Sequence, residues 1–311
     1  MSTDAQAGPQ GGHSFSVLET EKVNPATREI DRMSPLEIVR AMNAEDAKVA
    51  AAVEQELPHI ARAIEAIAAR LRRGGRLIYV GAGTSGRLGA LDASECPPTF
   101  NIPPETVVAC IAGGPIALGR AAEDFEDSAE AGQADVAQLA LSEADALVGI
   151  AASGRTPYVL GAIAYAKEQG ALTIGIACNA GTPLAKTVEI IITPLVGPEA
   201  ITGSTRLKAG TAQKMVLNML STGTMILLGK TFGNLMVDVQ PTNLKLQKRA
   251  IEIVRLATGL DKEAAEALFH AAGGEVRTAI VAGLTNSTPE IARERLVTHN
   301  NILRQALDAL P

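Results

Sequence analysis

The stretch RLIYVGAGTSGRLGALD, residues 76–92, opens with a short apolar run, turns through glycines and continues at helical spacing. This pattern is typical of a buried strand that leads directly into a helix. Four more apolar runs of similar length follow it, and helical stretches separate them. They are TVVACIAGG (106–114), ALVGIAASG (146–154), ALTIGIACN (171–179) and EIIITPLVG (189–197). The alternation predicts an α/β fold, a doubly wound parallel five-stranded sheet with helices on both faces.

Helical segments flank the predicted sheet at both ends of the chain. From Ser34 to the glycine pair at 74–75, apolar residues recur at helical spacing, and Ser34 and Glu37 form a capping box. After the fifth strand, residues 209–229 predict a long, mostly buried helix that closes the sheet domain. Beyond about residue 243 the sequence has amphipathic stretches, which predict a small C-terminal helical subdomain.

These patterns divide the chain into four parts. Residues 1–16 have almost nothing to bury and are expected to form a disordered tail. An N-terminal helical segment is expected over residues 17–58 and the sheet domain over residues 59–230. The C-terminal helical subdomain then covers residues 231–311.

The composition argues against several classes of partner. The 311 residues carry 28 basic and 34 acidic side chains, a net charge of −6 that offers no footprint for a phosphate backbone. Aromatic residues make up 3% of the chain and Trp is absent, which leaves little for stacking on single strands. The longest apolar stretch, 216–229, is too short and too interrupted to span a membrane. The N-terminus has no signal-peptide pattern. We therefore expect a cytoplasmic protein that binds neither nucleic acid nor a membrane.

Metal ligands and disulfides are not indicated by the sequence. Three cysteines and four histidines occur, and none of them is placed at the spacing of a local metal site or a CxxC pair. An odd number of cysteines also argues against a disulfide framework, which fits a reducing compartment. We expect no metal and no cofactor.

The glycine-rich turn at residues 81–86, Gly-Ala-Gly-Thr-Ser-Gly, satisfies the GxGxxG pattern of dinucleotide sites. Such a site also needs an acidic residue about 20 positions further on, at the end of the second strand, to hold the ribose. Here that strand ends in Ala-Gly-Gly at 112–114. The turn instead offers hydroxyls, backbone N–H groups and a cation, which suit a phosphate monoester better than NAD. The residues concerned are Thr84, Ser85, Gly86 and Arg87.

Two further hydroxyl-rich segments strengthen the prediction of a phosphate site. The one after the third strand contains Ser153, Gly154, Arg155 and Thr156. The one that opens the long helix contains Ser204, Thr205 and Lys208. Ligands of open α/β sheets bind at the carboxyl ends of the strands, so the three segments are expected to converge on one pocket. An ordinary N-cap would explain one such segment, but it is a weaker explanation for three.

Long motifs in this chain resemble one known family. The runs GAGTSGRLGALDASECPPTF (81–100), GIAASGRTPYV (149–159) and TGSTRLKAGTAQKMVLNMLSTGTM (202–225) are similar to those of the N-acetylmuramic acid 6-phosphate etherases, members of the sugar isomerase (SIS) superfamily. The resemblance extends to residues 20–38, 43–46 and 232–243, and so covers nearly the whole chain after the tail. It implies an SIS fold, a homodimer and cleavage of the D-lactyl ether of N-acetylmuramate 6-phosphate. The products would be N-acetylglucosamine 6-phosphate and D-lactate, as in amino-sugar catabolism and peptidoglycan recycling.

The implied chemistry needs only an acid and a base. In the open-chain sugar the C1 aldehyde acidifies the C2 proton, so elimination of the lactyl group followed by addition of water can replace direct hydrolysis. The resemblance implies that Glu95 is the proton donor and Glu126 the second acid–base group of a carbon–oxygen lyase. From the residues alone, we expect Glu95 to be partly buried near the carboxyl edge of the sheet, where Pro97 and Pro98 end a helix. Glu126 stands in an acidic cluster that a solvated helix face would also explain.

Two other functions remain open on the same sequence. An aldose–ketose phosphosugar isomerase would use a similar pocket and remove the C2 proton, but it would need no acid for a leaving group. A sugar-phosphate-sensing regulatory protein would only bind the ligand; the presence of both glutamates favours catalysis instead. The long helix at 209–229 offers more apolar surface than one sheet face needs, which is consistent with burial against a second copy. Of the lysines near its start, Lys208 is a better phosphate candidate than Lys214.

Overall fold

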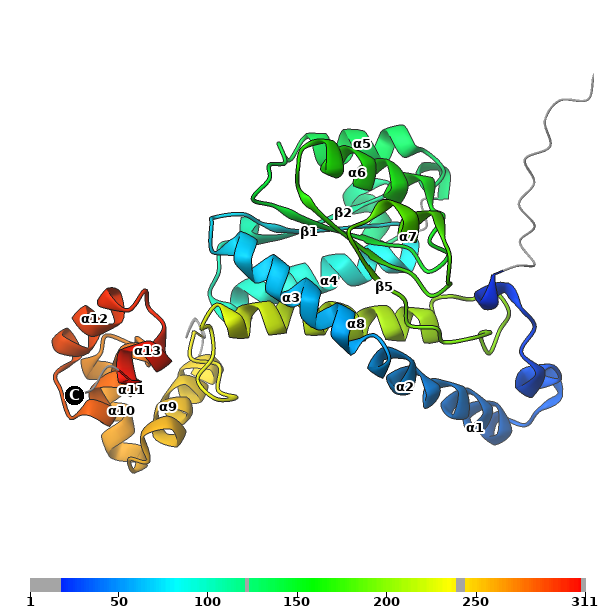
Figure 1. Cartoon of the computed structure of the whole chain (residues 1–311). Coiled ribbons are helices and arrows are strands. Elements are labelled where there is room, and N and C mark those ends of the chain that lie inside the picture. The colour runs from blue at the N-terminus through cyan, green and yellow to red at the C-terminus, as the bar shows by residue number, and fades with distance from the viewer. Residues whose placement is uncertain (1–17, 121–122, 239–243, 309–311) are drawn as a thin grey trace, which may run out of the picture.

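A five-stranded parallel sheet with the order β2-β1-β3-β4-β5 forms the centre of the protein (Figure 1). The computed structural model describes residues 18–120, 123–238 and 244–308, so the predicted tail at 1–16 lies outside the described residues. Each strand falls within one of the apolar runs, which confirms the predicted fold class. The strands are β1 (Leu77–Gly81), β2 (Val107–Ile111), β3 (Ala146–Ile150), β4 (Leu172–Ile176) and β5 (Ile190–Ile192).

Helices cover both faces of the sheet because successive strand residues point to opposite sides. In β1, Leu77 and Tyr79 belong to the core beneath one layer of helices, whereas Ile78 and Val80 belong to the core beneath the other. The first layer contains α3 (Leu57–Leu71), α4 (Gly83–Phe100) and α8 (Lys208–Leu227). The second contains α5 (Ala129–Ala137), α6 (Pro157–Glu168) and α7 (Pro183–Thr187).

The N-terminal segment begins with three short 3₁₀ turns and continues into two helices that extend away from the sheet (Figure 1). The predicted capping box is confirmed, since the Ser34 backbone N–H and hydroxyl both donate to Glu37 Oε2, at 2.8 and 2.6 Å. The turns are Glu19–Glu21, Pro25–Thr27 and Ile30–Arg32, and the helices are α1 (Pro35–Asp46) and α2 (Lys48–Glu54).

The C-terminal helices gather at one end of the molecule around a hydrophobic core of their own (Figure 1). Val254, Phe269 and Ile280 are among the residues buried in that core. The helices are α9 (Leu244–Thr258), α10 (Lys262–Ala271), α11 (Val276–Thr285), α12 (Pro289–Thr298) and α13 (Leu303–Asp308). No helix within the described ranges is both long and apolar enough to cross a membrane.

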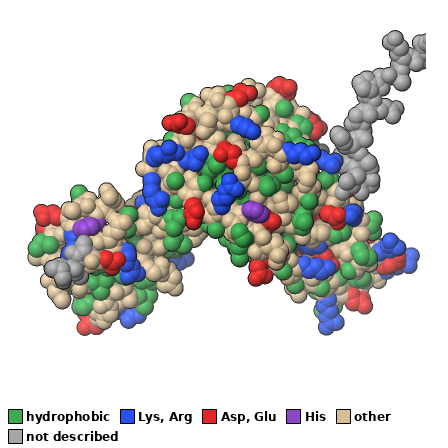
Figure 2. All heavy atoms as spheres, in the orientation of Figure 1, with side chains coloured by type: hydrophobic (Ala, Val, Ile, Leu, Met, Phe, Trp, Pro, Cys, Tyr) green, Lys and Arg blue, Asp and Glu red, His purple; other side chains and the backbone are tan. Residues whose placement is uncertain are grey.

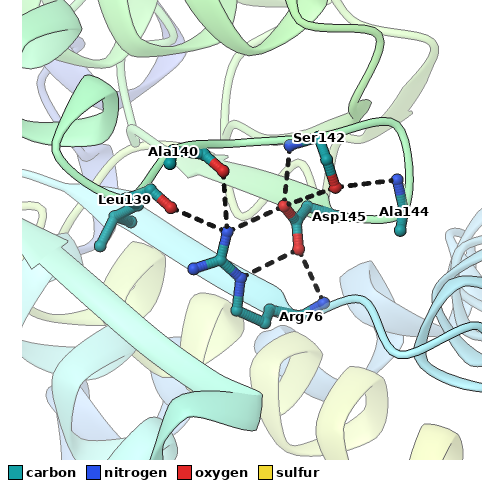
Figure 3. A network of polar contacts seen from close by, with 6 residues as sticks. All are labelled: Arg76, Leu139, Ala140, Ser142, Ala144 and Asp145. Carbon is teal, nitrogen blue, oxygen red and sulfur yellow. Dashed lines mark hydrogen bonds and ion pairs between the residues drawn. The ribbon is translucent and has the colours of Figure 1, made fainter.

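An ion pair joins the amino ends of β1 and β3, the two strands between which the order of the sheet reverses (Figure 3). The Arg76 guanidinium donates to both carboxylate oxygens of Asp145, at 3.0 and 2.9 Å, and the Ser142 backbone N–H donates to the same carboxylate. Burial by itself raises the pKa of Asp145, but hydrogen bonds from Arg76 and Ser142 outweigh burial and hold that pKa below its ordinary value. The two strands pair in parallel from Leu77 opposite Ala146 to Gly81 opposite Ile150, and ligands of this fold class bind at these carboxyl ends.

One local prediction was wrong. Helix α4 does not end at Pro97 and Pro98 but continues to Phe100. Each proline removes one N–H and with it one hydrogen bond to the carbonyl four residues earlier, yet the backbone stays helical through both residues. The helix ends at Asn101, which adopts a left-handed conformation with φ 49° and donates its N–H to Pro97 O at 2.9 Å.

Candidate active site

The three hydroxyl-rich loops meet at the carboxyl edge of the sheet. We call them loop 1 (residues 82–87, after β1 and including the first turn of α4), loop 2 (residues 152–157, after β3 and up to the first residue of α6) and loop 3 (residues 202–208, up to the first residue of α8). Loop 1 touches the start of α8, because a Cβ built on Gly210 would lie 3.5 Å from Thr84 Cγ2. The Gly210 N–H donates in turn to Thr205 O of loop 3.

Loops 2 and 3 are joined through an N-terminal residue that sequence reasoning did not place at this edge. Asn179, just after β4, donates from Nδ2 to Ala152 O at 2.9 Å and to Thr20 Oγ1 at 3.1 Å. The Gly203 N–H of loop 3 donates to Thr20 O at 3.2 Å. Further along the N-terminal segment, Thr27 Oγ1 donates to Ala200 O at 2.8 Å. The motif at residues 20–38 is part of the family resemblance, but it contains no pattern that predicts this contact.

Loop 1 presents an uncapped helix N-terminus to the edge of the sheet. Among the described residues, no side chain caps the first turn of α4. Glycine is required here for close approach of helix and strand, since a Cβ on Gly86 would lie 2.6 Å from both Gly81 O and Ile111 Cγ1. Free N–H groups and the positive end of an 18-residue helix are features that can bind an anion.

A buried amide from α8 adds a donor next to loop 1. The Ser85 hydroxyl donates to Gln213 Oε1 at 3.0 Å, and both residues are buried. Gln213 Nε2 is buried and has no hydrogen-bond partner among the described residues. A buried donor without a partner is costly, and a bound oxygen would satisfy it. Gln213 could not be singled out from the sequence, since a glutamine within a helical motif carries no signal of this role.

Loop 2 lies beside Glu126, one of the two predicted acid–base residues. The Thr156 hydroxyl donates to Glu126 Oε1 at 3.4 Å, and the Tyr158 N–H donates to Glu126 O at 3.1 Å. Glu126 is half-buried. Ser153 and Arg155 are half-buried in the same loop, and the Arg155 N–H donates to Ser153 Oγ at 3.2 Å. Glu126 is therefore held at the edge where the loops meet.

Loop 3 differs from its predicted role because a carboxylate already occupies the N-terminus of α8. The Glu199 side chain is fully buried and accepts hydrogen bonds from Lys208 N at 2.9 Å and Ala209 N at 3.0 Å. Burial raises the pKa of Glu199, although these hydrogen bonds oppose the increase. An anion cannot use the same N–H groups. Two of the residues predicted to bind phosphate in this loop, Ser204 and Thr205, are half-buried and so still reach the surface.

Two predicted phosphate-binding cations have their charged ends engaged elsewhere. Lys208 is 1% exposed, and its ammonium lies 2.6 Å from a carboxylate oxygen of Glu45 on α1. The Arg87 guanidinium donates to Ala117 O at 3.0 Å and to Arg120 O at 2.8 Å, and so braces the segment after β2. This geometry argues against a direct phosphate contact from either side chain. Their structural role depends on partners far away in the sequence.

Glu95 lies away from the loops of its own chain. It follows Ser85 by ten residues on the same helix, a separation of about 15 Å at 1.5 Å per residue. Helix α4 runs back from the carboxyl edge, so the expectation that Glu95 lies near that edge was wrong. The side chain is also exposed in the single chain, not partly buried as expected. The cause is the direction of α4, which carries Glu95 ten residues away from Ser85 before the prolines are reached.

Neither the surface charge nor a cluster of metal ligands indicates a second site among the described residues. On the visible face of the molecule, acidic and basic side chains are interspersed (Figure 2). Within the described ranges, no three His, Cys, Asp or Glu side chains lie close enough together to hold a metal ion.

Comparisons with known proteins give the same fold and show the family of the chain. One matching family model is described as the glucokinase regulatory protein N-terminal SIS domain (residues 59–167), and another as the SIS domain (residues 122–223). The chain is 53% identical to an N-acetylmuramic acid 6-phosphate etherase of Salmonella agona (strain SL483), over 94% of this chain and 99% of that protein. A protein of the same name from Serratia proteamaculans (strain 568) is 55% identical with the same coverage.

A solved structure supports the fold alone. It is a protein of Bacteroides fragilis NCTC 9343 provisionally assigned as a phosphosugar isomerase involved in capsule formation. Its TM-score is 0.50 at 22% identity, over 64% of this chain and 94% of that one. This structure covers 64% of the chain, whereas the curated relatives cover 94%.

Proposed function

Because this chain belongs to the N-acetylmuramic acid 6-phosphate etherase family, we propose that it cleaves the D-lactyl ether at C3 of N-acetylmuramate 6-phosphate. The products are N-acetylglucosamine 6-phosphate and D-lactate, and the enzyme is a carbon–oxygen lyase of amino-sugar catabolism. The observation that carries the proposal is the identity to relatives of that name along almost their full length. Release of D-lactate from the phosphorylated sugar by the purified protein is the direct test.

In the proposed mechanism, Glu126 and Glu95 divide the proton transfers between them. Glu126 removes the C2 proton of the open-chain sugar, and Glu95 protonates the lactyl oxygen as the C3–O bond breaks. The product of this step is an unsaturated aldehyde. Water then adds at C3 while the C2 position regains a proton, so the two carboxyl groups exchange roles. The sequence leaves open which glutamate acts first, and the contact of Glu126 with loop 2 favours Glu126 as the base at C2.

The 6-phosphate is assigned to loops 1 and 2. The open N-terminus of α4 and the hydroxyls of Thr84 and Ser153 supply donors, and the unpartnered Gln213 Nε2 lies beside them. Ser85, Gly86, Gly154, Arg155 and Thr156 shape the same edge, and Ser204 and Thr205 close it from loop 3. We leave Arg87 and Lys208 out of the phosphate contacts because other groups of the protein hold their charged ends.

A second copy of the chain is needed to complete this site. Five covalent bonds separate the phosphorus from C3 of the sugar, and they span much less than the roughly 15 Å between Ser85 and Glu95 of one chain. We therefore propose a homodimer in which one copy supplies the loops and Glu126, and the other supplies Glu95. An apolar groove of about 710 Å³ between α3 and α8, lined by Ile60, Ile64 and other residues, offers surface for the contact.

Loss of the phosphate should greatly reduce turnover. Hydrogen bonds to a charged group contribute about 1.5–3 kcal/mol each. Replacing Ser153 by Ala is therefore expected to weaken binding of N-acetylmuramate 6-phosphate by about 10- to 100-fold.

Dephosphorylated N-acetylmuramate should be a very poor substrate of the unmodified enzyme. Steady-state D-lactate release measures both effects, and Ser287→Ala, in the turn between α11 and α12, is the control. Comparable turnover of the two sugars would show that the phosphate site is assigned wrongly.

Isotope labelling distinguishes elimination from cleavage on the lactyl side. Because water replaces the lactyl oxygen at C3, reaction in ¹⁸O-water should label the amino sugar and leave the D-lactate unlabelled. Deuterium from the solvent should also enter at C2. Mass spectrometry of the amino sugar and of the D-lactate measures the ¹⁸O and deuterium content of each product. Label in the lactate, or no deuterium at C2, would contradict the proposed mechanism.

A further inference from the structure

A small pocket beside Glu95 has a composition that the phosphate site does not explain. It lies between α4 and α8, which pack side by side, and has a volume of about 220 Å³ (Figure 1). Its apolar lining comes from Leu88 and Leu91 of α4 and Leu217 of α8. Among the described residues, its one cation is Lys214 of α8, which shares the pocket with Glu95. The pocket therefore combines an apolar wall, a positive charge, the proposed proton donor and a second carboxylate, Asp92.

Lys214 is held in place by a chain of hydrogen bonds that ends in the core. With its amide nitrogen turned toward Asp92, Asn218 donates to Asp92 Oδ1 at 3.3 Å and accepts from Lys214 Nζ at 3.0 Å. Asp92 is fixed in turn by the Tyr79 hydroxyl at 2.8 Å and by the Ser221 hydroxyl at 3.1 Å. An ammonium group has three donors, and the bond to Asn218 uses one of them.

The lactyl group of the proposed substrate matches this lining. It carries a methyl group and a carboxylate on the carbon that also bears the ether oxygen. Any group that protonates the ether oxygen must therefore lie next to the group that binds the carboxylate. In the described chain, Glu95 and Lys214 stand in this relation on adjacent helices.

We propose that Lys214 binds the lactyl carboxylate and that Leu88, Leu91 and Leu217 contact the lactyl methyl group. This inference rests on the proposed etherase function and deepens it, since it names the residue that selects a carboxylate-bearing 3-ether. The ion pair fixes the ether oxygen next to Glu95. Asn218 and Asp92 are positioning residues, because they act on the substrate only through Lys214.

The test compares two substrates that differ in one charge. They are N-acetylmuramate 6-phosphate and its lactamide analogue, in which a carboxamide replaces the carboxylate. Lys214→Met is expected to lower kcat/KM for the acid by about 10- to 100-fold, the range for a hydrogen bond to a charged group. For the amide, Lys214→Met and the unmodified enzyme should differ little. Lys214→Arg, which keeps the charge, should recover part of the activity on the acid.

The controls separate this inference from the function on which it rests. Lys248→Met removes an exposed lysine from α9 and should leave both substrates unaffected. An equal loss on acid and amide, or no loss on either, would overturn the assignment of Lys214 while leaving the etherase function in place. Equal loss together with loss of C2 deuterium exchange would assign Lys214 to the C1 oxygen instead. If the unmodified protein releases no D-lactate, the proposed function fails and this inference fails with it.

Discussion

Replacing Glu95 by Gln is expected to lower kcat for D-lactate release by about 10²- to 10⁴-fold, the usual contribution of a general acid. The amide keeps the shape of the side chain but cannot protonate the departing lactyl oxygen. KM should change little, because loops 1 and 2 provide the phosphate contacts. Exchange of the C2 proton with solvent deuterium should continue, since Glu126 is unchanged. Kinetics of D-lactate release and NMR of the C2 position measure the two steps separately.

The matched control is Glu105→Gln, which removes an exposed glutamate from the turn before β2. It should retain the activity of the unmodified enzyme. The reverse pattern is expected for Glu126→Gln, which should lose both C2 exchange and D-lactate release. Glu95 would be excluded as the acid if Glu95→Gln retained activity within a few-fold of the control.

Mixing the two inactive variants tests whether sites are shared between copies. In a heterodimer of Glu95→Gln and Glu126→Gln chains, one of the two sites receives both intact glutamates. Random exchange of subunits should therefore restore about a quarter of the full activity, since half of the dimers are mixed and each has one working site. If each site lay within one chain, mixing would restore nothing. Sedimentation at micromolar concentration must first show that the protein is a dimer. Only then does recovery of activity, or its absence, decide whether the site is shared.

Much of the fold follows from local patterns in the sequence. Strands β1, β3 and β4 are runs of five buried residues, and helical stretches separate them, so the type and order of these elements are determined locally. The end of α4 was less predictable, because a proline inside a helix usually kinks or breaks it, whereas α4 continues through Pro97 and Pro98. The position of Glu95 did not depend on that end, since Glu95 precedes both prolines and ten residues of helix separate it from Ser85 of loop 1.

The errors in the candidate site come from contacts between residues distant in the sequence. Lys208 stands next to a hydroxyl-rich loop and has the local pattern of a phosphate ligand. Its partner, Glu45, lies 163 residues earlier on α1, and nothing in either segment indicates the pairing. Glu199 likewise closes the N-terminus of α8 from nine residues upstream. A strand-to-helix turn indicates an anion site in sequence, but only the fold shows whether the protein fills it with its own carboxylate.

The buried pair of Lys208 and Glu45 should be important for stability. Both residues are almost completely buried, at 1% and 3% exposure. Removing one partner of such a pair leaves an uncompensated charge and costs about 3–5 kcal/mol. Lys208→Met is therefore expected to lower the free energy of unfolding by about 3 kcal/mol, near the low end because Lys48 also contacts Glu45 at 2.6 Å. Lys208→Met combined with Glu45→Met should recover most of the loss, because it removes both charges. Urea unfolding measures all three proteins.

The pH dependence of stability gives an independent test of the same pair. Burial by itself raises the pKa of Glu45, but hydrogen bonds from Lys208, Lys48 and Asn24 outweigh burial and lower the pKa to about 2, from an ordinary 4.5. A lowered folded-state pKa stabilises the protein at pH values above 4.5, and this contribution is lost as the pH falls toward 2. Unfolding free energies should therefore drop over this window, and Lys208→Met should show a smaller drop because the main cause of the lowered pKa is gone. Equal slopes for the two proteins would mean that another group controls acid stability and that Lys208 does not hold Glu45 ionised.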